Sequence, residues 1–334
     1  MMELSETVVL STRVRLARNF AAYPFPHRLF DEAVARTVIR TVYDALSGLD
    51  DFTLYRLAET DDETIKRLLE NNLISPALLS HKSIAAAIVN AEETVSVMVN
   101  EEDHLREQCI LPGSNVWGCY ELLSGIDDEI SKSAVLAYDE HFGYLTACPT
   151  NIGTGLRCSL MLFLPALTKN GLIPSLKEKM SRLGMVLRGA HGEGSEASGF
   201  LYQLSNEVTL GVSEMKILSE VNNVALKIIQ FEGEERQNLF AADSLSLQDS
   251  ALRAFGILTH CVLLSYEEMI SLMADLKLGV ALGIVKGDVP ALEDLSGAML
   301  DTNLVMREGK PLTERELKTK RAHYVKSALQ DIIG

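Results

Sequence analysis

Four short segments of this 334-residue chain combine arginines, carboxylates and glycines in a pattern suited to phosphate chemistry. Arginine presents a rigid fork of N–H donors that matches a phosphate group, and glycine lets the backbone approach a ligand closely. The segments read STRVRLARN (residues 11–19), NEEDHLR (100–106), CPTNIGTGLR (148–157) and RGAHGEGSEA (188–197). Together they predict a phosphate-binding site with carboxylates beside it.

Each segment also has a simpler interpretation when it is taken alone. Arg13 and Arg15 lie two apart in an alternating stretch, where they could form a solvated strand face. Glu101 and Glu102 could be an ordinary acidic turn, and Cys148 could be a small buried hydrophobic residue. The presence of all four segments in one chain favours a functional site, because a set of arginines is more specific than any one of them.

Alternating and periodic stretches predict the elements that would position these segments. Residues 8–16 alternate apolar and polar side chains, which predicts a strand that points both of its central arginines to one face. Residues 83–89 and 94–99 flank Asn-Ala-Glu-Glu and predict a β-hairpin, with the acidic segment at the end of its second strand. Residues 213–231 predict a long helix, and from residue 244 onward the pattern is helical almost throughout.

The four segments together resemble the guanidino phosphotransferase family, also called phosphagen kinases, and within it the bacterial protein arginine kinases. The resemblance covers roughly residues 8–235 strongly and the remainder more weakly. The first motif begins at residue 11, which leaves no room for the helical domain that precedes it in the kinases of small metabolites. The GEGSEA loop followed by QLSN and the helical C-terminal part also favour the protein-directed branch.

The resemblance implies an α+β fold, in which an antiparallel sheet flanked by helices forms the catalytic domain and a small all-helical domain follows. The expected catalytic domain spans residues 8–235, and the expected C-terminal domain for dimerisation or regulation spans residues 240–334. The change of pattern after Glu235 places the boundary at residues 235–243. Within the first domain, residues 127–138 predict a helix.

Phosphoryl transfer to a guanidinium needs several arginines, at least two carboxylates and a flexible loop, because positioning and electrostatics do most of the work. The resemblance implies that Glu102 and Glu193 grip the acceptor guanidinium and help to deprotonate it, and that Cys148 positions it. The ATP-binding set that it implies is Ser11, Thr12, Arg13, Val14, Arg15, Arg106, Arg157, Cys158, Ser159, Leu160, Met161, Arg188, Gly189, Ala190, His191 and Gly192.

The expected cofactors are ATP and Mg²⁺, with the metal held mainly by ATP and not by protein side chains alone. Glu101 and Asp103 are expected to organise water and magnesium, or the arginines. His104 and His191 are interpreted as structural or close to the nucleotide, since neither has a second His or Cys at metal-ligand spacing.

Two departures from the family pattern carry expectations of their own. The protein-directed branch has an RDxxRA motif that binds phosphoarginine and regulates activity. The matching stretch here is RELKTK at residues 315–320. Arg315 is kept but Thr319 replaces the second arginine, so regulation by phosphoarginine through Arg315 is expected to be weak. Asn72 stands where the branch usually has a histidine, so contacts to the nucleotide could differ there.

Composition excludes some classes of protein and leaves others open. The formal net charge of −15 disfavours a nucleic-acid-binding protein and is compatible with a cationic partner such as an arginine-rich protein surface. The chain has no stretch apolar enough to suggest a membrane span, and its start does not resemble a signal peptide. The five cysteines show no paired spacing, which suits a reducing cytoplasm.

The leading functional hypothesis is ATP-dependent phosphorylation of arginine side chains in proteins. The resemblance further implies a stress-response role in which phosphoarginine marks proteins for a Clp unfoldase–protease, an activator or adaptor protein as partner, and a possible homodimer. The alternative in the same chemical class is a kinase for free arginine or another small guanidino metabolite. A non-enzymatic adaptor with a decayed site is a third reading, against which the intact glutamates and arginines argue.

Overall fold

The computed structural model describes residues 2–29, 31–49, 51–189 and 198–333, and these form two compact units that are not consecutive halves of the chain. The first unit comprises residues 11–159 and 205–223. The second unit comprises residues 1–10, 160–204 and 224–334. Three of the four segments predicted to carry chemistry therefore lie in the first unit, and the described residues of the fourth, Arg188 and Gly189, belong to the second.

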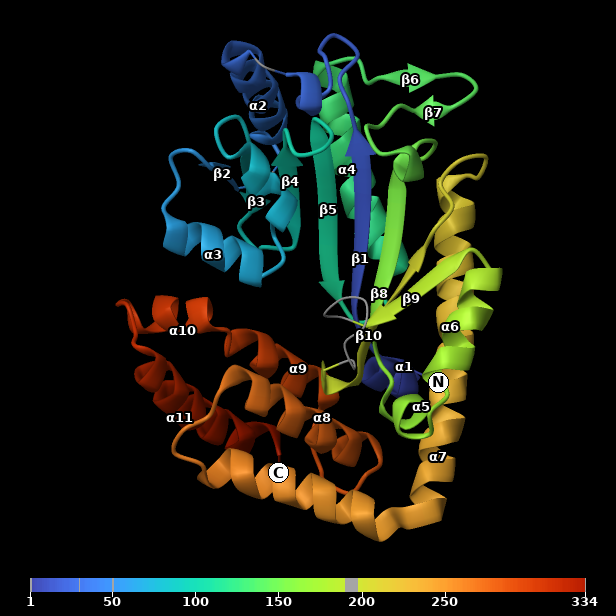
Figure 1. Cartoon of the computed structure of the whole chain (residues 1–334), viewed down its shortest axis with the longest axis vertical. Coiled ribbons are helices and arrows are strands. Elements are labelled where there is room, and N and C mark those ends of the chain that lie inside the picture. Colours follow the sequence, from blue (N-terminus) through green and yellow to red (C-terminus); the bar gives the residue numbers. More distant parts are fainter. Residues whose placement is uncertain (1, 30, 50, 190–197, 334) are drawn as a thin grey trace. The chain divides into compact units, whose positions relative to one another are not determined.

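An eight-stranded sheet with the order β2-β3-β4-β5-β1-β8-β10-β9 forms the framework (Figure 1). The pairs β2–β3, β3–β4, β4–β5 and β5–β1 are all antiparallel, so the predicted α+β fold with an antiparallel sheet is confirmed. The strands are β1 (Val9–Arg18), β2 (Phe52–Arg56), β3 (Ala86–Asn90), β4 (Val95–Val99), β5 (Leu105–Pro112), β8 (Leu156–Phe163), β9 (Met185–Gly189) and β10 (Leu201–Asn206), with β6 (Tyr138–Asp139) and β7 (Gly143–Tyr144) in a separate two-stranded sheet.

The hairpin predicted around Asn-Ala-Glu-Glu is the β3–β4 pair, and the acidic segment lies between β4 and β5 as expected. The helices of the first unit are α2 (Glu32–Leu46), α3 (Asp62–Glu70) and α4 (Val116–Ser133). The predicted helix over 127–138 was wrong in its bounds, because the buried stripe of α4 already begins at Val116 and the chain is extended at Ala134. Helix α4 lies along one face of β5 and β1 (Figure 1), where Cys119 Sγ contacts Thr12 O at 3.5 Å.

Helices make up most of the second unit. They are α1 (Met2–Val8), α5 (Pro165–Lys169), α6 (Ile173–Arg182), α7 (Glu214–His260, which starts in the first unit), α8 (Tyr266–Ala281), α9 (Val289–Ala298), α10 (Asp301–Glu308) and α11 (Glu314–Ile332).

Short 3-10 helices occur in both units, at η1 (Pro26–Arg28), η2 (Pro76–His81), η3 (Pro149–Asn151) and η4 (Ser198–Phe200). None of the helices in the described part of the chain has a segment that is long and apolar enough to cross a membrane.

Helix α7 runs through residues 235–243, where the sequence pattern changes, without an intervening loop. Asp243 has non-helical backbone angles (φ −154°, ψ 73°), and its carboxylate accepts a hydrogen bond from Ser246 N at 3.0 Å. A kink with a new N-terminal cap therefore marks the change of pattern. In the second unit, Leu10 and Phe163 are buried against Ala274 and Leu278 of α8.

Candidate functional site

Strand β1 presents three residues on one face and buries the alternate ones. Ser11, Arg13 and Arg15 are partly accessible, whereas Thr12, Val14 and Leu16, which alternate with them, are buried. In the antiparallel register with β5, Arg15 lies opposite Gln108, and Ala17 opposite Arg106. Paired residues of neighbouring strands point to the same face of a sheet, so the three arginines of these strands share one side. The prediction that a strand directs Arg13 and Arg15 to one face is confirmed.

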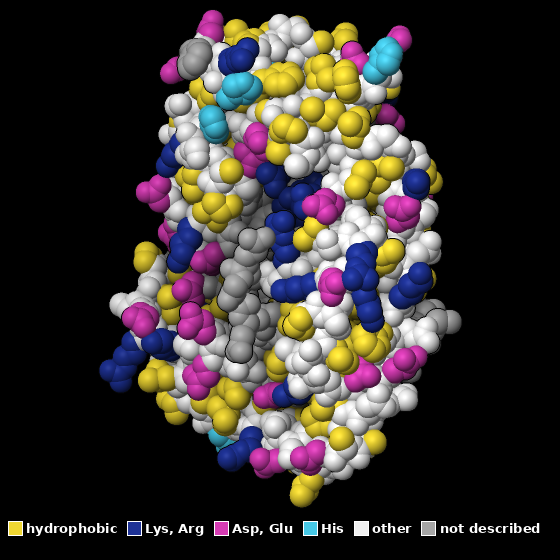
Figure 2. Space-filling model, turned by 45° about the vertical axis from the view of Figure 1, so that its right-hand side comes forward, with side chains coloured by type: hydrophobic (Ala, Val, Ile, Leu, Met, Phe, Trp, Pro, Cys, Tyr) yellow, Lys and Arg dark blue, Asp and Glu magenta, His cyan; other side chains and the backbone are white. Residues whose placement is uncertain are grey.

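A pocket of about 200 Å³ opens on this side of the first unit. Basic side chains gather in a recess on one face of the molecule, with acidic side chains beside them (Figure 2). The pocket is lined by Arg15, Leu16, Ala17, Glu101, Glu102, Asp103, Arg106, Cys148, Thr150, Asn151, Gly155 and Arg157. The structure thus brings together three segments that are far apart in the sequence, and with them Glu102 and Cys148.

Arg13 and Arg15 are only partly accessible and lie close to like charges. Burial, followed by the charge of Arg106, lowers the pKa of Arg13 from 12.5 to about 10. Burial also lowers the pKa of Arg15 well below its ordinary value, and the charges of Arg13, Arg106 and Arg157 add to the effect. Within the described part of the chain, the Nε groups of Arg13 and Arg15 are buried without a hydrogen-bond partner. An anion bound here would relieve the repulsion and supply acceptors.

The acidic segment forms a tight turn between β4 and β5. Asn100 has a left-handed backbone (φ 60°), and its N–H donates to His104 O at 2.9 Å. Glu101 is buried and accepts from Arg106 Nη1 at 2.8 Å, which ties this arginine to the turn. Asp103 Oδ1 accepts from Ala147 N at 2.6 Å and from an asparagine amide. Glu102 is the exposed carboxylate of the turn and is free to face the pocket.

A buried polar cluster supports this turn from behind. Asn19 Nδ2 donates to Asp103 Oδ1 at 2.6 Å, and Asn19 Oδ1 accepts from His104 N at 2.8 Å. The His104 ring is fully buried, stacks on Phe20 and accepts from Phe20 N through Nδ1 at 3.2 Å. This burial favours a structural role for His104 behind the turn, which is one of the two interpretations that the sequence left open. In the described residues, no group of three or more His, Cys, Asp or Glu side chains is placed to hold a metal ion.

Burial of His104 predicts a loss of stability in mild acid. Its pKa is lowered from 6.5 to about 4 by burial, so the unfolded chain takes up a proton at a higher pH than the folded chain. The stabilisation is complete above pH of about 6.5 and is lost as the pH falls to about 4, a change of roughly 3 kcal/mol. Urea unfolding of the wild type and His104→Gln across this range tests the prediction. Parallel pH profiles for the two proteins would contradict it.

The loop that carries Cys148 is held by Arg18, a residue that the sequence analysis did not single out. The thiol of Cys148 is partly accessible and lies 3.0 Å from Thr150 Oγ1. At the other end of the loop, Arg18 Nη1 donates to Thr154 O at 2.8 Å. Gly155 has a φ of +63°, and a Cβ there would lie 2.6 Å from Ala17 O, so only glycine fits this close approach.

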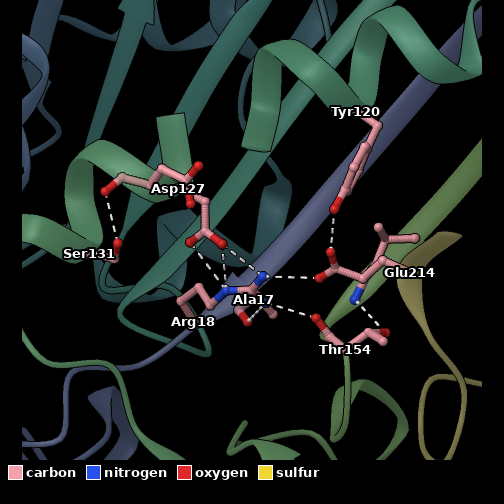
Figure 3. Close-up of polar contacts among 9 residues, drawn as sticks. Ala17, Arg18, Tyr120, Asp127, Ser131, Thr154 and Glu214 are labelled. Atoms are coloured by element: carbon pink, nitrogen blue, oxygen red, sulfur yellow. Dashed lines mark hydrogen bonds and ion pairs between the residues drawn. The ribbon is translucent and has the colours of Figure 1, made fainter. Parts of the chain in front are cut away.

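Arg18 is the centre of a buried ionic network on the α4 side of the sheet (Figure 3). Its guanidinium makes a bidentate contact with Asp127 of α4, with Nη2–Oδ2 at 2.8 Å, and lies 3.4 Å from Glu214 at the start of α7. Tyr120 donates its hydroxyl hydrogen to Glu214, and the Tyr144 ring lies 3.6 Å from the Arg18 guanidinium carbon. The network fixes the loop that brings Cys148 and Arg157 to the pocket.

The remaining predicted residues occupy four kinds of position. The side chains of Thr12, Val14, Cys158 and Leu160 are buried, so they could serve a ligand only through their main chain. Ser11 of β1 and Met161 of β8 are partly accessible, whereas the Ser159 side chain is buried and its Oγ donates to Arg13 O at 3.4 Å. Arg188 and Gly189 end β9 in the second unit. Ala190, His191, Gly192 and Glu193 lie outside the described residues.

Comparison with known proteins supports the interpretation of these segments. The model of the ATP:guanido phosphotransferase C-terminal catalytic domain matches residues 33–235, and that of the protein-arginine kinase McsB C-terminal domain matches residues 244–333. The protein-arginine kinase of Caldanaerobacter subterraneus subsp. tengcongensis is 41% identical over 334 residues, covering 98% of this chain and 99% of that protein. The protein-arginine kinase of Clostridium acetobutylicum is 40% identical over 330 residues, covering 97% and 96%.

The fold has relatives among solved structures as well. The crystal structure of lombricine kinase superimposes with a TM-score of 0.62 at 27% sequence identity, covering 71% of this chain and 68% of that chain. The two family models and the full-length relatives confirm the resemblance that the four sequence segments carry.

Proposed function

Because the chain belongs to the protein-arginine kinases of the ATP:guanido phosphotransferase family, we propose that it transfers the γ-phosphoryl group of ATP to arginine side chains of proteins. The observation that carries the proposal is the pocket of the first unit, in which several arginines face an exposed glutamate and a thiol. The arginines match a polyphosphate, and the glutamate matches a cationic acceptor.

The proposed reaction assigns a role to each group. Arg13, Arg15, Arg106 and Arg157 bind the phosphates and offset the charge of the transferred group, and the family resemblance assigns Arg188 the same task. A guanidino nitrogen attacks the γ-phosphorus in line with the leaving oxygen of ADP, so that an N–P bond forms as the P–O bond breaks. The proton of the attacking nitrogen passes to a carboxylate, for which Glu102 and Glu193 are proposed.

Magnesium fits this site as part of the nucleotide. Both oxygens of Glu101 are engaged, one by Ser75 and one by Arg106, and Asp103 is held by Asn19 and Ala147 N. The carboxylates of Glu101 and Asp103 therefore organise the arginines and the neighbouring loop, and the phosphate oxygens of ATP would hold Mg²⁺. When bound, the ion would neutralise part of the phosphate charge.

A direct assay tests the proposal and separates it from its alternative. The chain is incubated with ATP and magnesium, with casein or free arginine as acceptor, and the product is tested for an acid-labile, base-stable phosphoramidate. Phosphoarginine in casein supports the proposed function. Phosphorylation of free arginine alone would replace it with a kinase for a small guanidino metabolite, and no phosphoramidate in either arm would refute both.

Cys148 provides a second check on the acceptor side of the pocket. Its accessible thiol lines the pocket beside Glu102, so Cys148→Ser should lower the rate of phosphoryl transfer while the fold is kept. Alkylation of the thiol should inhibit, and ATP with an arginine acceptor should protect, because the acceptor would cover the sulfur. The rate and the mass of the labelled peptide report both effects. If the protein alkylated at Cys148 keeps full activity, Cys148 does not position the acceptor and only packs as a small apolar residue.

The wider role follows the family and is part of the same proposal. We infer a catalytic domain over residues 8–235 and a C-terminal domain over 240–334 that dimerises or regulates. Phosphoarginine would mark proteins in the cytoplasm for a Clp unfoldase during stress, with an activator or adaptor protein as a further partner. Substrates would present exposed arginines to an acidic protein, whose net charge is −15.

The C-terminal segment that replaces the RDxxRA motif supports weak regulation by phosphoarginine. Arg315 and Thr319 are both exposed on α11. The nearby cations are already paired, because Lys318 Nζ lies 2.6 Å from Glu314 Oε1 and Lys320 Nζ lies 2.8 Å from a carboxylate of Glu308. One arginine and two paired lysines offer a phosphate less than two arginines at fixed spacing.

A further inference from the structure

One short segment of the first unit, residues 72–75, is connected by hydrogen bonds to Arg13 and to the pocket-lining Arg106. It follows α3 and leads into η2. Asn72 has a φ of +58°, in the left-handed region that asparagine adopts more readily than most residues. Leu73 and Ile74 are buried in the hydrophobic cluster that α3 forms with β3. The segment is therefore held in place by its buried side chains.

Gln108 connects this segment to Arg13. The side chain of Gln108 is buried on β5, opposite Arg15 of β1 and Ser96 of β4. Its Oε1 accepts a hydrogen bond from Arg13 Nη2. Its Nε2 donates to Asn72 O at 2.6 Å and to Leu73 O at 3.4 Å. The side-chain amide of Gln108 is thus bonded at both ends. Its oxygen accepts from the Arg13 guanidinium, and its nitrogen donates to main-chain oxygens of the segment.

Ser75 makes the matching connection to Arg106. The Ser75 hydroxyl donates to Glu101 Oε1 and also caps η2 by accepting from Leu78 N at 3.2 Å. The other oxygen of Glu101 accepts from Arg106 Nη1 at 2.8 Å. Two separate connections, each through one intermediate side chain, therefore lead from the 72–75 segment to Arg13 and to Arg106.

We propose that Gln108 and Ser75 are positioning residues that set the phosphate-binding geometry of Arg13 and Arg106 from the 72–75 segment. The inference rests on the proposed function, because it assumes that these arginines bind the phosphates of ATP. A neutral amide suits Arg13, since it fixes the guanidinium and leaves the positive charge for the ligand. A carboxylate in the same place would neutralise much of that charge.

The first test compares Gln108→Met with a matched control, Ser96→Ala. Ser96 is buried beside Gln108, and its hydroxyl donates to Leu73 O at 2.7 Å, so it grips the same segment without contacting an arginine. Calorimetric titration with ATP should show about tenfold weaker binding for Gln108→Met, as expected for a lost hydrogen bond to a charged group. Ser96→Ala should bind ATP like the wild type. Equal losses in both variants, or none in Gln108→Met, would overturn the proposal.

A second comparison asks whether Gln108 acts through Arg13. In an Arg13→Met background, Gln108→Met should weaken ATP binding by less than about twofold, because the group that it positions is gone. Gln108→Glu should also weaken binding, while keeping an acceptor for Arg13. Ser75→Ala should have a smaller effect, since Arg106 keeps Glu101. A full tenfold loss in the Arg13→Met background would show that Gln108 supports the fold alone.

A measurement without nucleotide separates this inference from the proposed function. Phenylglyoxal modifies accessible arginines, and mass spectrometry can follow the rate at Arg13 in the full chain. Gln108→Met should raise that rate several-fold, and Ser96→Ala should not. If the wild type fails to bind ATP but the rates differ in this way, the proposed function is wrong and the positioning contact stands. Identical rates in the three proteins would refute the contact, whatever binds in the pocket.

Discussion

Glu102→Gln should reduce phosphoryl transfer to a protein arginine by about 10²–10⁴-fold and leave the affinity for ATP nearly unchanged. Glu102 is the exposed carboxylate of the turn, whereas Glu101 is committed to Arg106 and Asp103 to Ala147 N and an asparagine amide. Glutamine keeps the size of the side chain but cannot accept the guanidinium proton. The loss should therefore appear in the rate of the chemical step.

The measurement is the initial rate of phosphoarginine formation in casein, with ATP binding followed separately by calorimetry. Glu121→Gln is the matched control, because Glu121 is an exposed glutamate on α4 and does not line the pocket. It should retain the wild-type rate. If Glu102→Gln also turns over at close to the wild-type rate, the carboxylate that accepts the proton must be sought elsewhere.

Arg18→Met should destabilise the folded chain by about 3–5 kcal/mol. Arg18 is 1% exposed, and it lies between the carboxylates of Asp127 and Glu214. Glu107 is also buried there, and burial followed by the charge of Asp127 raises its pKa well above the ordinary value. Methionine would keep most of the volume, but the buried carboxylate of Asp127 would lose its bidentate partner.

Urea unfolding at neutral pH measures the loss. Arg40→Met is the control, because Arg40 makes an exposed pair with Asp44 at 3.4 Å, which should contribute less than about 1 kcal/mol. Adding Asp127→Asn to Arg18→Met should recover part of the stability, since the unpaired buried charge is removed. The interpretation fails if Arg18→Met unfolds at the same urea concentration as Arg40→Met.

The sequence predicted the parts of the site that depend on local pattern. Alternation in β1 directed Arg13 and Arg15 to one face, and the hairpin placed the acidic turn at a strand end. The resemblance to a family then predicted the antiparallel fold. These features depend on side chains that are neighbours in sequence or on whole motifs, and both can be read without coordinates.

The supporting residues could not be predicted in the same way. Arg18 and Asp127 are 109 residues apart, and their pairing is set by how α4 packs on the sheet. Gln108 looks like one more polar residue of an alternating strand, although it is buried and bonded at both ends. The helix predicted over 127–138 overlaps α4 only from Asp127 to Ser133, so the start of α4 at Val116 was missed.

The buried contact between α8 and strands β1 and β8 determines which fragments of this protein can fold. Leu10 of β1 and Phe163 of β8 are covered by Ala274 and Leu278, which the sequence assigns to the C-terminal domain. A fragment that stops near residue 240 would expose these apolar side chains to water, and it should aggregate on expression. The helices after residue 240 thus share a buried cluster with β1 and β8, and their study calls for point substitutions in the intact chain.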